Sequence, residues 1–444
     1  MTNFMRLIYL LALLTFALPL TAQQPNEALA TATGRVFTAA DLTPHARQHW
    51  DSRKEAVAAT RSALRTRMLN EHLLAVEAKS AGTTPEELIA AQYKKAPNPS
   101  EDQIKAVFDA NRNVFGDRSI DDARQQIVGF LRRDPEQKAL QAYLESLSTK
   151  YKVSPGKDIN AAGLKPTDVI FSAAGKSFTV QEFETQHRIE LNDAEADIID
   201  EVKADLESTI FSILVLDEAK AQNIDPGSLI AREISDKLKD FSDEERSELE
   251  SALRRKLFAK YNVRFTIPEP RPIVQNISVD DDPMIGKPSA PVTVVMFSDF
   301  QCPACARTHP ILKKVLSEYG DKVRFVVRDF PLENIHESAF GAALAASAAH
   351  KQGKFVEYIE ILYTNQNALD ASSLKKYAAD IGLNVKQFEI DLASEKSAAE
   401  VRKDIEDGMS YGVAGTPTIF VNGVKVRRLS ADSFRDAIDA ALKR

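Results

Sequence analysis

The chain of 444 residues has only two cysteines, Cys302 and Cys305. A scaffold held by several disulfides is therefore excluded. Long apolar runs are also scarce, since the longest, residues 7–20, is short of the roughly 18 to 20 residues that a membrane-spanning helix needs. The formal net charge is −7 and no basic stripe follows the sequence, which argues against nucleic acid as a partner.

The apolar run near the N-terminus has the features of a secretory signal peptide. Arg6 precedes it, and the small residues Thr21 and Ala22 follow it. We expect residues 1–22 to be a signal peptide cleaved after Ala22, with an uncleaved anchor as the alternative; a lipoprotein anchor would need a cysteine at that site. The sequence thus predicts a periplasmic or otherwise extracytoplasmic protein, in a compartment where disulfides persist.

The two cysteines lie in the stretch 298–305, between a β-branched run at 292–297 and a helical pattern at 308–319. A strand, a Cys-x-x-Cys motif and a helix in this order are typical of a redox site. The exposed N–H groups and the macrodipole of a helix start stabilise a thiolate, which predicts Cys302 as the nucleophile. Cys305, one turn later, can attack a mixed disulfide and is predicted to be the resolving thiol.

Three other roles for the cysteine pair were considered. A structural zinc site needs four ligands, and only His309 lies nearby. Covalent haem would need histidine at the position of Ala306. A purely structural disulfide stays open, although so small a loop constrains the unfolded chain little. The sequence therefore predicts no cofactor and no metal site.

Residues 23–263 are predicted to be helical and to contain one module twice, at 23–153 and 154–263. A shift of 141 positions aligns the beginnings of the two copies, and a shift of 110 aligns their ends, so the second copy is 31 residues shorter. Helix starts are predicted at Thr84, Ser100 and Ser242, each three residues before Glu or Gln, as in a capping box. The aligned pairs include Gly34 with Gly175, Phe37 with Phe178, Glu77 with Glu218, Pro85 with Pro226, and Tyr151 with Tyr261.

The helical pattern at 73–88, followed by 99–104 and later helices to Tyr151, resembles the chaperone domain of SurA and PrsA-type folding factors. The prolyl isomerase domain of those proteins is absent. The resemblance implies that this region binds unfolded polypeptide. An oligomerisation or spacer module is the alternative.

The pattern changes after residues 264–272, whose alternating prolines predict a semi-rigid linker. Strands and helices then alternate in 273–444, with a helical tract at about 337–408 that is too long for a single crossover. A hairpin around Asn422-Gly423 and a last amphipathic helix follow. We predict a multidomain protein in which an all-α duplicated N-terminal region precedes an α/β thioredoxin fold with a helical insertion.

The C-terminal part resembles the DsbA-like thiol-disulfide oxidoreductases in the order and spacing of several segments. The resemblance implies that Pro417 is cis and lies against the cysteine pair, and that the backbone at Thr416 pairs with an extended substrate peptide. The segments that carry it are 282–286, 290–292, 297–305, 329–332 and 415–418.

Two positions depart from that family's pattern. Met296 stands where many members have a buried acidic residue, and Asp299 is expected either to replace that acid or to cap the helix. Thr416, rather than valine, precedes Pro417, which leaves the direction of electron flow open. His309 is expected to be an exposed helical histidine, and His336 and His350 are expected to be structural.

The sequence predicts an exported thiol-disulfide oxidoreductase that forms or rearranges disulfides in extracytoplasmic proteins. Its expected partners are unfolded or reduced protein substrates and a redox partner protein, soluble or membrane-bound. The helical region would bind substrate or mediate assembly into a homo-oligomer. The alternatives are a chaperone-like holdase with an incidental cysteine pair, and a disulfide isomerase or reductase.

Overall fold

The computed structural model describes residues 27–279 and 282–444, so the predicted signal peptide lies outside the described residues. These residues divide into two compact units. The first unit comprises Lys54–Leu191, and the second comprises 27–53 together with Asn192–Arg444. Among the described residues, none of the helices has the length and apolar character to cross a bilayer.

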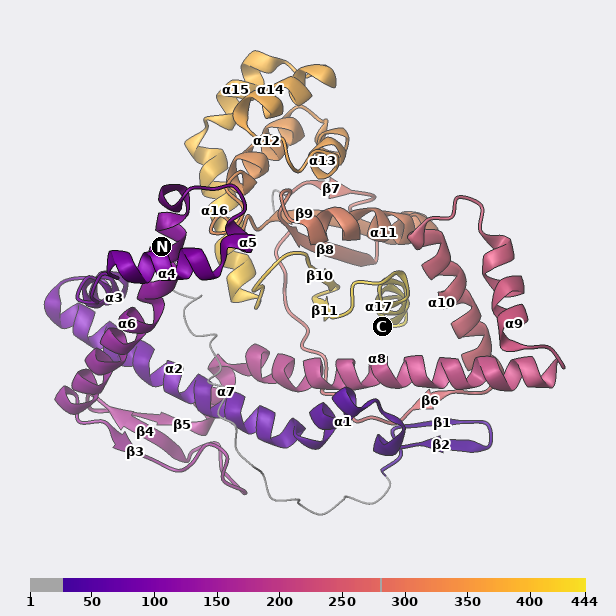
Figure 1. The fold of residues 1–444 in the computed structure, drawn as a ribbon, viewed down its shortest axis with the longest axis horizontal. Coiled ribbons are helices and arrows are strands. Elements are labelled where there is room, and N and C mark those ends of the chain that lie inside the picture. Colours follow the sequence, from indigo (N-terminus) through magenta and orange to yellow (C-terminus); the bar gives the residue numbers. More distant parts are fainter. Residues whose placement is uncertain (1–26, 280–281) are drawn as a thin grey trace. The chain divides into compact units, whose positions relative to one another are not determined.

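The first unit is mostly helical (Figure 1). Its long helices α2 (Arg53–Ala81) and α6 (Ile120–Lys150) accompany the shorter α3 (Pro85–Tyr93), α4 (Glu101–Ala110), α5 (Arg112–Phe115) and α7 (Val180–Gln186). A three-stranded sheet with the order β3 (Ser154–Pro155), β4 (Val169–Ala173) and β5 (Lys176–Thr179) is also present. Phe171, Phe178 and Phe183 are buried against α2 in one apolar core.

The helical part of the second unit has the same kinds of elements. They are β1 (Ala30–Ala32), β2 (Arg35–Phe37), α1 (Pro44–Asp51), α8 (Arg188–Ala221), α9 (Pro226–Glu233), α10 (Asp243–Lys260) and β6 (Arg264–Phe265). Strand β1 pairs with both β2 and β6. The prediction of a helical region is therefore confirmed in its main feature, but it missed two three-stranded sheets.

A short strand directly follows the last residue of each predicted copy. β3 follows residue 153 and pairs with β4 of the second copy, and β6 follows residue 263 and pairs with β1 of the first copy. The compact units therefore cut across the two copies.

Equivalent residues of the two copies nevertheless make equivalent contacts. Glu77 accepts hydrogen bonds from Lys150 Nζ at 2.5 Å and Tyr151 Oη at 2.6 Å. Glu218 accepts them from Lys260 Nζ at 2.6 Å and Tyr261 Oη at 2.9 Å. Each carboxylate thus ties the end of one long helix to the end of another.

The predicted capping boxes are present at Thr84 and Ser100, where side chain and backbone bond reciprocally. Ser242 also caps its helix, accepting from the N–H of Glu245. The reciprocal bond predicted there is wrong, because the Glu245 carboxylate accepts instead from the N–H groups of residues 239–241. The preceding turn offers three donors to that carboxylate.

The C-terminal part of the second unit contains a five-stranded sheet with the order β11-β10-β8-β9-β7. β8 (Val292–Ser298) and β9 (Val323–Asp329) are parallel, and β10 (Thr418–Val421), β11 (Val424–Val426) and β7 (Met284–Ile285) are antiparallel to their neighbours. Alternate residues of β8 enter two apolar cores, one with α11 (Pro303–Tyr319) and α17 (Ala431–Leu442), the other with α16 (Glu395–Ser410). The sheet is therefore covered on both faces, as its continuous apolar strands require.

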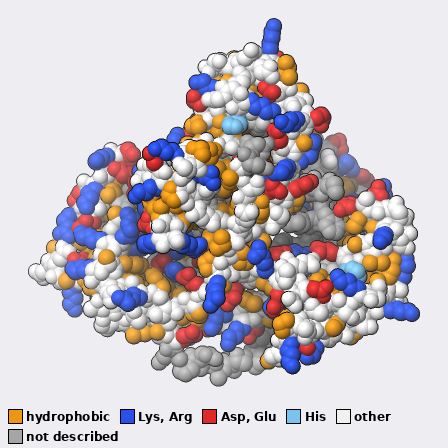
Figure 2. All heavy atoms as spheres, turned by 180° about the vertical axis from the view of Figure 1, so that it is seen from behind, with side chains coloured by type: hydrophobic (Ala, Val, Ile, Leu, Met, Phe, Trp, Pro, Cys, Tyr) orange, Lys and Arg blue, Asp and Glu red, His pale blue; other side chains and the backbone are white. Residues whose placement is uncertain are grey.

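The helical insertion lies between β9 and β10, where the sequence predicts it. Besides α16 it contains α12 (Ala339–Lys351), α13 (Phe355–Thr364), α14 (Ala371–Asp380) and α15 (Val385–Leu392). The predicted hairpin is β10-β11, with Asn422 and Gly423 both at positive φ. On the face in view in Figure 2, basic and acidic side chains are interspersed.

Candidate active site

The cysteine pair lies where β8 ends and α11 begins. Cys302 is the N-cap residue of α11, with φ −75° and ψ 120°, and Pro303 occupies the first helical position, where no N–H is needed. Two backbone carbonyls of the turn accept hydrogen bonds: the N–H of Cys302 donates to Asp299 O at 3.1 Å, and the Gln366 side chain donates to Cys302 O at 2.9 Å. The turn is thereby held by its own backbone and by the loop between α13 and α14.

The two thiols differ in accessibility. Both cysteines are free, Cys302 retains 6% of its surface in contact with solvent, and Cys305 has none. The Cys302 Sγ lies 3.4 Å from the carbonyl oxygen of Thr416, and the Thr416–Pro417 peptide bond is cis. The structure therefore brings together all four residues that the sequence analysis selected, although their chemical roles stay predictions.

The environment separates the acidities of the two thiols. Donation from the Cys305 thiol, followed by contact with Thr416 and the N–H groups of Cys305 and Ala304, lowers the pKa of Cys302 to about 5 in spite of burial. Burial and the hydrogen bond to Cys302 raise the pKa of Cys305 well above its usual value. From the sequence, the low pKa of Cys302 is expected from the helix start alone. In the structure, the hydrogen bond from the Cys305 thiol lowers this pKa more than the helix start does.

Asp299 is fully buried and does not cap α11, and its expected role as a replacement for the missing acid stays a prediction. Its carboxylate accepts from the N–H groups of Gln301 at 2.7 Å and Leu332 at 2.9 Å, and its Oδ2 lies 2.7 Å from His336 Nδ1. It does not cap α11, whose N-cap has no side-chain hydrogen bond. Asp299 fixes the turn before Cys302 to the loop after β9, which carries Leu332 and His336.

The deeper polar groups near Cys305 were not predicted. Ser298 Oγ and Tyr363 Oη are 2.6 Å apart and buried, and Ser298 is in register with Asp329 on the neighbouring strand. Burial raises the pKa of Asp329 and of Tyr363 well above their usual values. Met296 is apolar, so the carboxyl groups near the cysteines are those of Asp299 and of Asp329, and only the strand register reveals Asp329.

Arg328, next to Asp329, is completely buried among carboxylates. Its guanidinium contacts Asp282 at 3.0 Å, Asp407 at 2.8 Å and also Asp404. Burial and the nearby Asp404 raise the pKa of Asp282 to about 9. This cluster anchors β9 to α16 behind the site.

The expectation of an exposed His309 is wrong. Its side chain is 4% exposed and its Nε2 lies 3.1 Å from Glu360 Oε1, so it links α11 to α13. Burial lowers the pKa of His309. The partner lies 51 residues away, in the insertion, which no local pattern could indicate.

A thioredoxin family model matches residues 278–440. The C-terminal part of the chain is accordingly a thioredoxin-like α/β domain. The match does not include the helical region, so the resemblance of that region to SurA and PrsA-type domains stays a prediction.

Curated relatives match over a similar length. The chain is 38% identical over 157 residues to the Na(+)/H(+) antiporter NhaA 1 of Mycolicibacterium gilvum, covering 35% of this chain and 25% of that protein. It is 35% identical over 158 residues to the Na(+)/H(+) antiporter NhaA of Herminiimonas arsenicoxydans, with the same coverage. The chain therefore spans about a quarter of the length of these relatives.

Similar solved structures include a thioredoxin-like oxidoreductase from Silicibacter pomeroyi, with 27% identity and a TM-score of 0.34, covering 37% of this chain and 93% of that one. BdbD from Bacillus subtilis has 24% identity and a TM-score of 0.35, covering 39% and 100%. These TM-scores are low, and the assignment of the domain rests on the sequence match.

Proposed function

We propose that the protein is an exported thiol-disulfide oxidoreductase whose redox pair is Cys302 and Cys305. The observation that carries the proposal is the pairing of a thiol of pKa about 5, which keeps 6% of its surface exposed, with a fully buried thiol of raised pKa at the helix start of a thioredoxin-like domain. In such a pair only the sulfur of Cys302 exchanges with substrate, and Cys305 reacts only with Cys302. The steps of thiol-disulfide exchange therefore occur in a fixed order.

The oxidative cycle follows from these two acidities. A substrate thiolate attacks Cys302 Sγ of the disulfide form, the Cys302–Cys305 bond breaks, and Cys305 leaves and takes up a proton, as its raised pKa favours. A second substrate thiolate attacks the substrate sulfur of the mixed disulfide and releases the Cys302 thiolate. The substrate loses two electrons and the pair gains them, and a redox partner protein reoxidises the pair.

Oxidation is the direction that the thiolate favours. At pH 7 a group of pKa about 5 is almost wholly ionised, which stabilises the dithiol form and makes the disulfide an oxidant. Thr416 before the cis proline keeps isomerase or reductase activity as the alternative direction. In each case the Thr416 carbonyl, 3.4 Å from Cys302 Sγ, is next to the backbone that an extended substrate peptide would approach.

The helical region is proposed to hold unfolded substrate or to mediate homo-oligomer assembly. Phe241, after α9, and Leu216, on α8, expose 73% and 56% of their surfaces in a part of the second unit that is otherwise rich in charge. Replacing both with serine should slow oxidation of a large reduced protein and leave oxidation of a short dithiol peptide unchanged. Unchanged rates for both substrates, together with an unchanged oligomeric state, would exclude these two side chains from either role.

Two cysteine variants test the redox assignment. Cys302→Ser should abolish oxidation of a reduced protein, whereas Cys305→Ala should accumulate mixed disulfides that non-reducing electrophoresis detects. The Ser317→Ala variant, on the same helix α11, is the matched control and should retain activity. Full activity of the Cys302 variant would refute the assignment, and a holdase would suppress aggregation equally well without either cysteine.

A further inference from the structure

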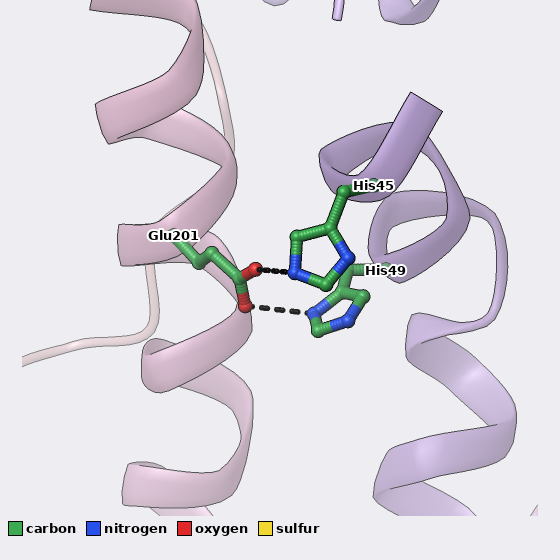
Figure 3. A group of neighbouring side chains, drawn as sticks. All are labelled: His45, His49 and Glu201. Carbon is green, nitrogen blue, oxygen red and sulfur yellow. Dashed lines mark ion pairs between the residues drawn. The ribbon is translucent and has the colours of Figure 1, made fainter. Parts of the chain in front are cut away.

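Two histidines and a glutamate converge on one point far along the sequence from the cysteines. His45 and His49 lie one turn apart on α1, and Glu201 lies on α8. His45 Nε2 is 3.1 Å from Glu201 Oε1, and His49 Nδ1 is 2.7 Å from Glu201 Oε2. Figure 3 shows both imidazole rings directed from α1 toward the same carboxylate.

The spacing of these atoms suits a transition-metal ion. The candidate ligand atoms of the three side chains all lie within 4.8 Å of one another. Tetrahedral Zn²⁺ with bonds of about 2.0 to 2.2 Å holds its ligand atoms about 3.3 Å apart, so small side-chain rotations would suffice. Two imidazoles and one carboxylate are also a donor set that Zn²⁺ uses with a fourth position left for water.

The backbone that carries these residues is fixed independently of the candidate ligands. The N–H and hydroxyl of Thr43 donate to Asp205 at 3.0 and 2.6 Å, one turn along α8 from Glu201. Ala46 and Trp50 of α1 are buried in the core that includes Ile199 and Val202 of α8. The two histidines and the glutamate therefore face each other on a preformed pair of helices.

The site is open to water. The side-chain exposures of His45, His49 and Glu201 are 74%, 38% and 40%. A metal ion can therefore enter without opening the core, and water can complete its coordination.

We propose that His45, His49 and Glu201 form a binding site for a divalent transition-metal ion of the Zn²⁺ class. Each neutral imidazole binds the metal through the lone pair of one ring nitrogen and keeps its N–H on the other, and Glu201 binds through a carboxylate oxygen. The metal joins α1 to α8 and so fixes residues 27–53, the first described segment of the chain, to the helix that begins at Arg188. The sequence contained one part of this signal, two histidines at helical i and i+4 spacing, but not Glu201.

Zinc titration by calorimetry tests the proposal in the full chain with Cys302 and Cys305 oxidised to a disulfide, so that their thiolates cannot bind the metal. One Zn²⁺ ion per chain is expected. His45→Gln, His49→Gln and Glu201→Gln should each weaken binding at least about tenfold, since even partners of metal ligands cost roughly 10 to 100-fold when removed. Glu195→Gln, an exposed glutamate of the same helix, should leave binding unchanged.

A second measurement distinguishes metal coordination from ion pairs between the two histidines and Glu201. Co²⁺ added to the oxidised chain should give the intense visible absorption of a tetrahedral site, and the His49→Gln variant should lose it. The melting temperature should rise with Zn²⁺ in the parent chain and in Glu195→Gln only. The proposal is overturned if no Zn²⁺ binds, or if Zn²⁺ binds equally well to all three ligand variants.

Discussion

The hydrogen bond from the Cys305 thiol to Cys302 makes a quantitative prediction about acidity. It is the largest influence that lowers the pKa of Cys302 to about 5. A hydrogen bond to a charged group contributes roughly 1.5 to 3 kcal/mol. Because one pKa unit corresponds to about 1.4 kcal/mol, its loss should raise the pKa by about 1 to 2 units.

Two substitutions at one position separate the contribution of this donor from that of the helix. Cys305→Ala removes the donor, so the pKa of Cys302 should rise to about 6 or 7 by the arithmetic above. Cys305→Ser keeps an O–H donor, so the pKa should stay near 5. The ultraviolet absorbance of the thiolate, followed against pH in the reduced protein, measures each value because a single cysteine then remains.

An unchanged pKa of Cys302 in Cys305→Ala would contradict the stabilisation of its thiolate by the Cys305 thiol. It would mean that the N–H groups of Ala304 and residue 305, with the dipole of α11, suffice to stabilise the thiolate. A raised pKa in both variants would instead indicate that only sulfur at position 305 donates in the right geometry.

The same pKa has a consequence for stability and redox potential. A pKa lowered from 9.0 to about 5 contributes stability to the reduced form that is complete above pH 9 and is lost as pH falls through 5. At pH 7 it contributes at most about 2.7 kcal/mol, and we take about 2 kcal/mol to allow for screening by water at this partly solvated sulfur. That corresponds to a disulfide about 40 mV more oxidising than one without the effect.

Three further predictions concern stability. Arg328→Met should lower the free energy of unfolding, measured by denaturant titration, by about 3 to 5 kcal/mol, because it leaves buried carboxylates without their partner. A loss below about 1 kcal/mol would contradict the role of Arg328 in anchoring β9 to α16. Asp282→Asn should flatten the pH dependence of the free energy of unfolding between about pH 4 and 9. The raised pKa of Asp282 gives stability at low pH that is lost as pH rises through 9. An unchanged pH dependence would show that Asp282 is ionised throughout this range. Glu77→Gln and Glu218→Gln should each cost about 1 to 2 kcal/mol, as equivalent residues of the two copies, and unequal costs would contradict that equivalence.

The sequence predicted those parts of the domain whose signals are local. The apolar β8, the helix start at Pro303 and the hairpin at Asn422-Gly423 each depend on neighbouring residues, and each is present. The site was located for the same reason, since both cysteines and the preceding strand lie within one short stretch.

Features that depend on distant partners were not predicted. The two-residue strands β3 and β6 have too little sequence to carry a signal, and each pairs with a strand outside the copy that it directly follows. His309 is buried because Glu360 reaches it from the insertion. Arg328 lies in β9 with two other charged residues, Arg324 and Asp329, so its charge gives no sign of its burial. Its partners on α16, Asp404 and Asp407, lie 76 and 79 positions away.

The reduction potential of the Cys302–Cys305 pair measures whether its disulfide can oxidise protein thiols. The full chain is equilibrated with mixtures of reduced and oxidised glutathione, and the fraction of the pair in each state is measured by thiol alkylation and mass spectrometry. We expect a reversible two-electron couple more positive than roughly −200 mV, which would make the pair an oxidant of protein thiols. A potential near that of thioredoxin, about −270 mV, would contradict the oxidase direction, and failure of the pair to form a disulfide at all would contradict the redox function.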